Sequence, residues 1–119
     1  MSITYLCTSI FDSPARTLVC PVNCVGVMGA GLALEFKRRF PEMYERCRRV
    51  PLAPGSLFVW NNPLADRPDV LCFPTKGHWR DRSTLTIIAD GLHEFVENWQ
   101  VYASGSIAFP KLGCGLGWA

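Results

Sequence analysis

The chain has 119 residues, a hydrophobic fraction of 49% and a formal net charge of +2. A chain of this length supports one hydrophobic core, so we expect a single domain over residues 1–119. The small net charge does not indicate non-specific nucleic-acid binding by the surface as a whole. No apolar run approaches the ~20 residues needed to cross a bilayer, and the amino terminus lacks a signal-peptide pattern, so we expect neither membrane insertion nor export.

The six cysteines are typical of a reduced protein. Four of them lie in or beside apolar, strand-like runs, where a free thiol packs as a small core residue: Cys7, Cys20, Cys72 and Cys114. No two cysteines have the Cys-x-x-Cys spacing of a zinc or thioredoxin site, and His78 and His93 lie far from any cysteine cluster. We therefore expect a reducing, cytoplasmic environment, no structural metal and no cofactor.

Short runs of β-branched and apolar residues predict strands at residues 3–7 and 17–22. After Gly31 the apolar residues Leu32, Phe36 and Phe40 recur every four positions, which predicts an amphipathic helix. Pro41 cannot continue that helix without a kink but suits the first turn of a new one, so we expect a bent or split helix. Its second part turns three residues inward: Met43, Tyr44 and Cys47.

Further strands are predicted at residues 57–60 and 70–73, and a last one at 106–109. Residues 84–99 resume helical spacing, with five apolar residues expected to face the core: Leu85, Ile88, Leu92, Phe95 and Trp99. The alternation of strands and helices predicts an α/β fold of three layers, with a mixed central sheet covered by helices on both faces.

A glycine-rich segment at residues 23–31 joins a predicted strand to a predicted helix and reads Asn-Cys-Val-Gly-Val-Met-Gly-Ala-Gly. Glycines let the backbone approach a ligand closely, and the free N–H groups at a helix start attract phosphate. A tight turn that only allows close helix packing is the alternative. The spacing is not that of a Gly-x-Gly-x-x-Gly dinucleotide site, and no Gly-Lys-Ser or Gly-Lys-Thr follows as in a P-loop. We interpret the segment as a phosphate-binding loop of another kind.

A second glycine-rich segment, residues 110–117, follows the last predicted strand. Two such loops at neighbouring strand ends are suited to hold a diphosphate from both sides. Residues 73–80 form a third segment, which places Lys76 just past a strand and beside the same crevice. Its ammonium group would neutralise phosphate or, with its pKa lowered by burial, act as a base or nucleophile. A solvated surface lysine is the alternative interpretation.

The residues after Lys76 combine cations with an aromatic ring, as surfaces for single-stranded nucleic acid do: His78, Trp79, Arg80 and Arg82. A solvated loop with one buried tryptophan explains the same composition.

These segments, in order, resemble a known family. Residues 22–33 with Phe36-Lys37 and Phe40-Pro41, then 73–76 with 78–80, then 107–110 with 112–115 are similar to the DarG branch of the macrodomains. Members of that branch are antitoxins that remove ADP-ribose from thymidine in DNA after its attachment by a DarT toxin, and they are similar to terminal ADP-ribose protein glycohydrolase. The resemblance covers nearly the whole chain.

The resemblance implies a site for ADP-ribose without a metal. Lys76 matches the catalytic lysine, which works at the C1″ carbon of the distal ribose. The residues that the resemblance places around the ligand come from four segments: Ser9, Ile10, Asn23, Gly26, Val27, Met28, Gly29, Ala30, Gly31, Thr75, Gly113, Cys114, Gly115, Leu116 and Gly117.

The chain departs from the family pattern in three places. Where the family reads Gly-Asp-Leu-Phe, with the aspartate on the adenine amino group, this chain has Thr8-Ser9-Ile10-Phe11, so we expect weakened or altered adenine selection. Gly117 stands where protein-directed relatives carry a catalytic aspartate. The closing helix of a macrodomain is also missing. Either the sequence is C-terminally truncated, or one face of the sheet is exposed or covered by a second protomer.

Three functions remain open at this stage. The first is hydrolysis of the bond between ADP-ribose and a DNA base, with Lys76 as catalyst, in an antitoxin whose partner is a DarT-like toxin. The second is a binding module for ADP-ribose or a related nucleotide signal without turnover. The third is a glycohydrolase for ADP-ribosylated glutamate in proteins.

Overall fold

The computed structural model describes residues 9–24, 28–77, 85–103 and 105–112. In chain order the elements are η1 (Ile10–Asp12), β1 (Thr17–Asn23), α1 (Gly31–Arg39), α2 (Pro41–Cys47), β2 (Phe58–Trp60), β3 (Asp69–Lys76), α3 (Leu85–Tyr102) and β4 (Ile107–Ala108). The strand expected at residues 3–7 lies outside the described residues, and the other expected strands and helices are confirmed with somewhat different bounds. Within the described part of the chain, no helix is both long and apolar enough to cross a membrane.

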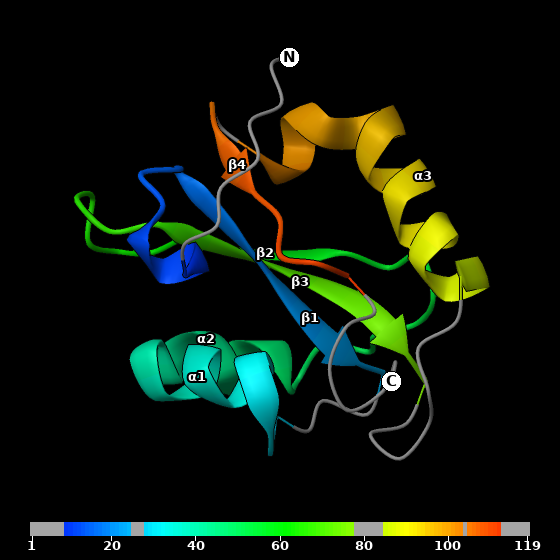
Figure 1. Cartoon of the computed structure of the whole chain (residues 1–119), viewed down its shortest axis with the longest axis horizontal. Helices are drawn as coiled ribbons and strands as arrows, with labels where there is room; N and C mark the ends of the chain where they lie inside the picture. The colour runs from blue at the N-terminus through cyan, green and yellow to red at the C-terminus, as the bar shows by residue number, and fades with distance from the viewer. Residues whose placement is uncertain (1–8, 25–27, 78–84, 104, 113–119) are drawn as a thin grey trace.

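The four described strands form one mixed sheet in the order β2-β3-β1-β4 (Figure 1). β1 runs parallel to β3 and to β4, whereas β2 is antiparallel to β3. Parallel neighbours in register end at the same edge of a sheet, and Asn23 at the end of β1 lies opposite Lys76 at the end of β3. The two central strands therefore present their carboxyl ends side by side.

Side chains of the central strands alternate between two cores, as the period of a β-strand requires. One core joins β1 to the helices α1 and α2 and includes Leu18, Cys20, Val22, Phe36 and Met43. The other joins the opposite face of the sheet to α3 and includes Val19, Leu71, Phe73 and Phe95. Helices thus cover both faces of the sheet (Figure 1), which confirms the three-layer α/β fold.

The predicted break between the first two helices is confirmed. α1 ends at Arg39, and Phe40 leaves the helical region with φ −132° and ψ 70°. Pro41 then occupies the first turn of α2, where its missing N–H costs no intrahelical hydrogen bond. The break folds α2 back along α1, and the two helices lie in contact.

The predicted inward face of α3 is partly wrong. Ile88 and Phe95 are buried as expected, but Leu85 is 72% exposed, and Leu92 and Trp99 are each more than a third exposed. The buried face instead includes Gly91, whose Cα side meets the ring of Phe73. Because Gly91 has no side chain, α3 can approach the sheet closely at this point. The face that α3 presents to the sheet therefore differs from the apolar face predicted from periodicity.

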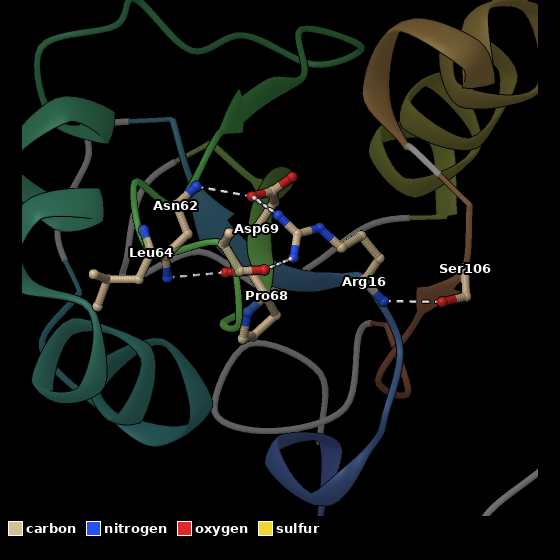
Figure 2. A network of polar contacts seen from close by, with 7 residues as sticks. Arg16, Asn62, Leu64, Pro68, Asp69 and Ser106 are labelled. Atoms are coloured by element: carbon tan, nitrogen blue, oxygen red, sulfur yellow. Dashed lines mark hydrogen bonds and ion pairs between the residues drawn. The ribbon is translucent and has the colours of Figure 1, made fainter.

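A polar network fastens the amino-terminal edge of the sheet (Figure 2). The buried carboxylate of Asp69 accepts a hydrogen bond from the backbone N–H of Asn62 at 2.8 Å and lies 3.6 Å from the guanidinium of Arg16. Arg16 also donates through Nη1 to the carbonyl of Ala65 at 2.7 Å, and its backbone N–H donates to the hydroxyl of Ser106 at 2.9 Å. The beginnings of β1, β3 and β4 are thereby joined at the edge opposite Asn23 and Lys76.

Candidate functional site

The carboxyl edge of β1 and β3 is shaped by an irregular register. Val22 lies opposite Pro74, but the next residue of β1, Asn23, lies opposite Lys76, so Thr75 is the extra residue of a bulge. The backbone N–H of Cys24 lies 3.0 Å from the carbonyls of both Lys76 and Gly77. Bulges redirect side chains and end regular pairing. The last residues of β3 therefore depart from the regular pairing with β1 that holds up to Pro74.

Pro74 explains why the bulge forms here. Proline has no N–H for a ladder, and inside a sheet it is found at edges, strand starts and bulges. The antiparallel pairing of β2 with β3 extends only to Cys72, so Pro74 also lies beyond the end of that ladder. The prediction that this strand ends at residue 73, with Lys76 just past it, is wrong: β3 continues through Pro74, and Lys76 is its last residue.

Three predicted site residues meet at this edge. Asn23 is buried at 4% exposure, whereas Lys76 is half-buried and so retains access to solvent. Thr75 is buried, and its hydroxyl donates to the carbonyl of Val22 at 3.5 Å, so its side chain helps to hold β3 against β1. Of the three, Lys76 is the side chain that combines charge with exposure.

The described part of the first glycine loop leads directly from this edge into α1. Met28 is buried in the core beneath α1, whereas Gly29, Ala30 and Gly31 are exposed. Gly31 adopts φ +59°, which favours glycine, and a side-chain atom added there would meet nothing within 4 Å. Ala30 caps α1 without a side-chain hydrogen bond, so the first N–H groups of the helix are not capped by that residue and suit an anion.

Ser9 and Ile10 lie elsewhere. The Ser9 hydroxyl caps η1 by accepting from the Phe11 N–H at 3.2 Å, and Ile10 packs against the α1–α2 core. The ring of Phe11 lies 4.8 Å from that of Phe36 and 4.2 Å from the guanidinium of Arg39. With a rise of about 1.5 Å per residue, these contacts place η1 roughly 8–12 Å along α1 from Gly31. The structure does not bring Ser9 to the edge that carries Lys76.

The remaining predicted site residues lie outside the described residues. They are Gly26, Val27, Gly113, Cys114, Gly115, Leu116 and Gly117 of the two glycine loops, and His78, Trp79, Arg80 and Arg82 of the basic and aromatic run.

Sequence reasoning missed Cys24 as a site residue. Its N–H closes the bulge, and its partial burial raises the pKa of its thiol. The available signal was Pro74, which directly follows the strand predicted at residues 70–73, because a proline in a sheet is confined to edges, strand starts and bulges. Among the described residues, no group of three or more His, Cys, Asp or Glu side chains is placed to hold a metal ion.

Together these features define an α/β domain whose candidate site joins the carboxyl ends of two parallel strands to a glycine-led helix start. The family model of the Macro domain matches residues 19–118, and the chain belongs to the macrodomain family.

The chain is similar to proteins from two bacteria. It is 42% identical over 120 residues to the DNA ADP-ribosyl glycohydrolase of Mycobacterium tuberculosis strain ATCC 25618 / H37Rv, covering 97% of this chain and 34% of that protein. It is 35% identical over 128 residues to the DNA ADP-ribosyl transferase-DNA ADP-ribosyl glycohydrolase fusion protein of Thermosipho africanus strain H17ap60334, covering 91% of this chain and 33% of that one. The chain thus spans about a third of the length of these relatives.

The fold of the chain is also similar to solved structures of macrodomains. The macrodomain of Mycobacterium tuberculosis DarG superposes with a TM-score of 0.88 at 40% identity, covering 99% of this chain and 81% of that chain. Thermosipho africanus DarTG in complex with ADP-ribose superposes with a TM-score of 0.82 at 37% identity, covering 92% of this chain and 32% of that chain.

Proposed function

We propose that this domain binds ADP-ribose at the carboxyl edge of β1 and β3 and hydrolyses the bond between ADP-ribose and a thymidine of DNA. The observation that carries the proposal is the meeting of Asn23 and Lys76 across the bulge, beside the start of α1. The relatives named DNA ADP-ribosyl glycohydrolase and the ADP-ribose complex of Thermosipho africanus DarTG support the ligand and the reaction.

The arrangement suits cleavage at C1″ of the distal ribose. The diphosphate would lie at the start of α1, where Ala30 provides no side-chain cap and the first N–H groups suit an anion. The distal ribose would then reach the strand ends, where Lys76 supplies a half-buried cation that retains access to solvent. In the reaction the C1″–base bond breaks with its electron pair going to the base, a water oxygen bonds to C1″, and the water proton passes to the base. Lys76 stabilises the negative charge that develops on the departing base, or its amine, once it has lost a proton, displaces the base from C1″ and is in turn displaced by water.

Two substitutions of Lys76 separate these roles. We expect Lys76→Ala to lower release of ADP-ribose from an ADP-ribosylated thymidine oligonucleotide by about 10²–10⁴-fold, because it removes both the charge and the amine. Lys76→Arg keeps the charge but not the nucleophile, so its activity distinguishes stabilisation from covalent attack. Calorimetric titration with ADP-ribose is the control, and binding should survive in both variants.

A second function is favoured by Ser9. The hydroxyl that replaces the family's aspartate is engaged in capping η1, so it adds no charge toward an adenine. A binding module without turnover fits that observation. If neither the parent chain nor Lys76→Ala releases ADP-ribose from DNA while both bind it, the binding module is correct. Release from ADP-ribosylated glutamate in a protein substrate, but not from DNA, would instead assign the protein-directed activity.

We propose an antitoxin role beside a DarT-type transferase, supported by the Thermosipho africanus relative in which transferase and glycohydrolase form one chain. We also propose the cytosol as its location, because the buried thiols of Cys20, Cys47 and Cys72 are free, as expected of a reducing compartment. Co-expression of the chain with such a transferase tests the role, since only an active antitoxin restores growth.

A further inference from the structure

The positive charge of the chain is concentrated in one stretch. Six of its 12 Lys and Arg residues and three of its 10 Asp and Glu residues lie between positions 35 and 49, so this stretch carries +3 while the remainder carries −1. The stretch comprises most of α1, all of α2 and the turn after it. Its cations are Lys37, Arg38, Arg39, Arg46, Arg48 and Arg49.

Two of these cations converge on one aromatic ring. The ammonium of Lys37 lies 4.4 Å from the centroid of the Tyr44 ring, and the guanidinium of Arg48 lies 5.8 Å from it. Contacts of this kind hold flexible side chains in place and so reduce the entropy lost when the cations bind a ligand. We call Lys37, Tyr44, Arg48 and the exposed Arg49 the α1–α2 basic surface.

This surface lies along the two helices that follow the candidate site in the chain, the first of which begins beside the strand ends. The turn at Phe40 and Pro41 folds α2 back along α1, and contact of Lys37 with Tyr44 fixes the pairing of the two helices. The end of α2 therefore returns toward the beginning of α1 (Figure 1), and Arg48 directly follows the last residue of α2. Lys37 lies six residues after Gly31, or about 9 Å along the helix. In B-form DNA the phosphates of one strand advance by about 3.4 Å along the helix axis, so a strand with that rise spans the distance with roughly three nucleotides.

The cations of this surface remain available to an external anion. Arg48 makes an ion pair with Glu45 at 3.5 Å, but both side chains are about half exposed, and such pairs contribute little. For Arg49, the structure shows no carboxylate within ion-pair distance among the described residues. A phosphodiester backbone offers each cation an acceptor without removing it from water.

We propose that the α1–α2 basic surface binds the phosphate backbone of a single strand on one side of the modified nucleotide. The inference rests on the proposed function and adds a binding surface to it that lies outside the strand-end site. The Lys37 ammonium and the Arg48 guanidinium contact successive phosphates, and Arg49 extends the contact.

Nucleic acid fits this surface better than an acidic protein does. Protein interfaces are built around apolar and aromatic residues with polar groups at the rim. In the described part of the chain, the exposed large apolar residues lie on other elements: Leu64, Leu85, Leu92, Val96, Trp99, Val101 and Phe109. None lies in α1, α2 or the turn after it, where cations predominate.

The test uses the double variant Lys37→Gln/Arg48→Gln and, as a matched control, Arg67→Gln, an exposed cation at the amino-terminal end of β3. Binding of an unmodified, fluorescently labelled single strand of about 15 nucleotides is followed by anisotropy at several salt concentrations. Each lost phosphate contact lowers the salt slope by about 0.7 for a single strand, so the double variant should lower it by about 1.4 and weaken binding about 25-fold at ~0.1 M salt. Arg67→Gln should bind as the parent does.

Turnover completes the test. On an ADP-ribosylated dinucleotide, which is too short to reach Lys37, the double variant should match the parent in kcat and KM. On the long modified strand its KM should rise by the same factor as the loss of binding. An unchanged salt slope overturns the proposal, as does an equal loss on both substrates. Weakened retention on immobilised polyglutamate with unchanged strand binding would assign the surface to an acidic protein and also overturn it. Absence of all turnover, by contrast, refutes the enzymatic function and leaves the binding result to judge this surface.

Discussion

Gly91 offers a test of how closely α3 packs against the strand that carries the candidate site. A side-chain atom added at this position would lie 2.5, 2.7 and 3.1 Å from three atoms of the Phe73 ring, far inside normal contact. The ring cannot simply move away, because its centroid lies 6.3 Å from that of Phe109, which in turn lies 5.4 Å from that of Phe95. Overpacking of a core costs about 1–3 kcal/mol, and three short contacts place this case near 3.

Helix propensity acts in the opposite direction. Alanine is favoured over glycine in a helix by about 1 kcal/mol, so we expect Gly91→Ala to lower the free energy of unfolding by about 2 kcal/mol in total. For a domain of this size that corresponds to a fall in Tm of roughly 8 °C. Urea unfolding followed by circular dichroism measures the change directly.

Thr86→Ala is the matched control, because Thr86 is exposed on the same helix and gains propensity without meeting the sheet. It should raise stability by a few tenths of a kcal/mol, up to about 0.7. A cycle with Phe73→Leu should show a coupling of about 1 kcal/mol, since the smaller residue makes room for the alanine. If Gly91→Ala is as stabilising as Thr86→Ala, the close approach of α3 to Phe73 is wrong.

Three further predictions follow from single interactions. Asp69→Ala should lower the free energy of unfolding by about 2–3 kcal/mol in a urea titration, because it removes a buried carboxylate and leaves the part-buried Asn62 N–H without its acceptor and Arg16 without its carboxylate partner, whereas Asp66→Ala at an exposed site should change it by less than about 0.5. Burial and the nearby Glu94 raise the pKa of Tyr102 to about 12, so its phenol should ionise later than free tyrosine in an ultraviolet titration; the stability that this raised pKa contributes is present below the ordinary pKa and is lost as the pH rises through about 12. ADP-ribose should slow alkylation of Cys24, measured by peptide mass spectrometry, because Cys24 adjoins the strand ends, and equal rates with and without ligand would exclude that site.

Much of the fold was predictable because local rules decided it. The strand predicted at residues 17–22 and the helix break at Pro41 follow from β-branched and apolar residue type and from the missing N–H of proline, and both appear in the structure. The rotation of α3 was not predictable, because the choice between two apolar stripes depends on a contact between Gly91 and a residue of β3. Packing against the sheet, which the sequence of α3 alone does not encode, determines that the face of α3 with Gly91 is buried.

The candidate site also combines features that follow from local sequence with features that depend on tertiary contacts. Its glycine loop and Lys76 were predictable from residue type, but the meeting of Asn23 with Lys76 depends on a register shift that no periodicity reveals. The position of Ser9 beside the second half of α1 depends on a ring contact between Phe11 and Phe36. Residue chemistry therefore indicated what the site contains, whereas long-range pairing determined which residues meet.

The two edges of the sheet have different roles. The amino-terminal edge fixes the pairing of the strands, and the carboxyl edge, where the bulge follows Pro74, carries the candidate site. At the amino-terminal edge, the Asp69 carboxylate and its partners join three strand beginnings, which fixes β3 against β1. From there the register runs without interruption to Val22 and Pro74. With the ladder secured at one end, the strand tolerates a bulge at the other, where the last residues leave regular pairing. A more regular ladder would bury the end of β3 in backbone pairing. The bulge costs local pairing but leaves the Lys76 side chain half exposed beside a helix start, which is the arrangement that a cation acting on a ligand at the strand ends requires.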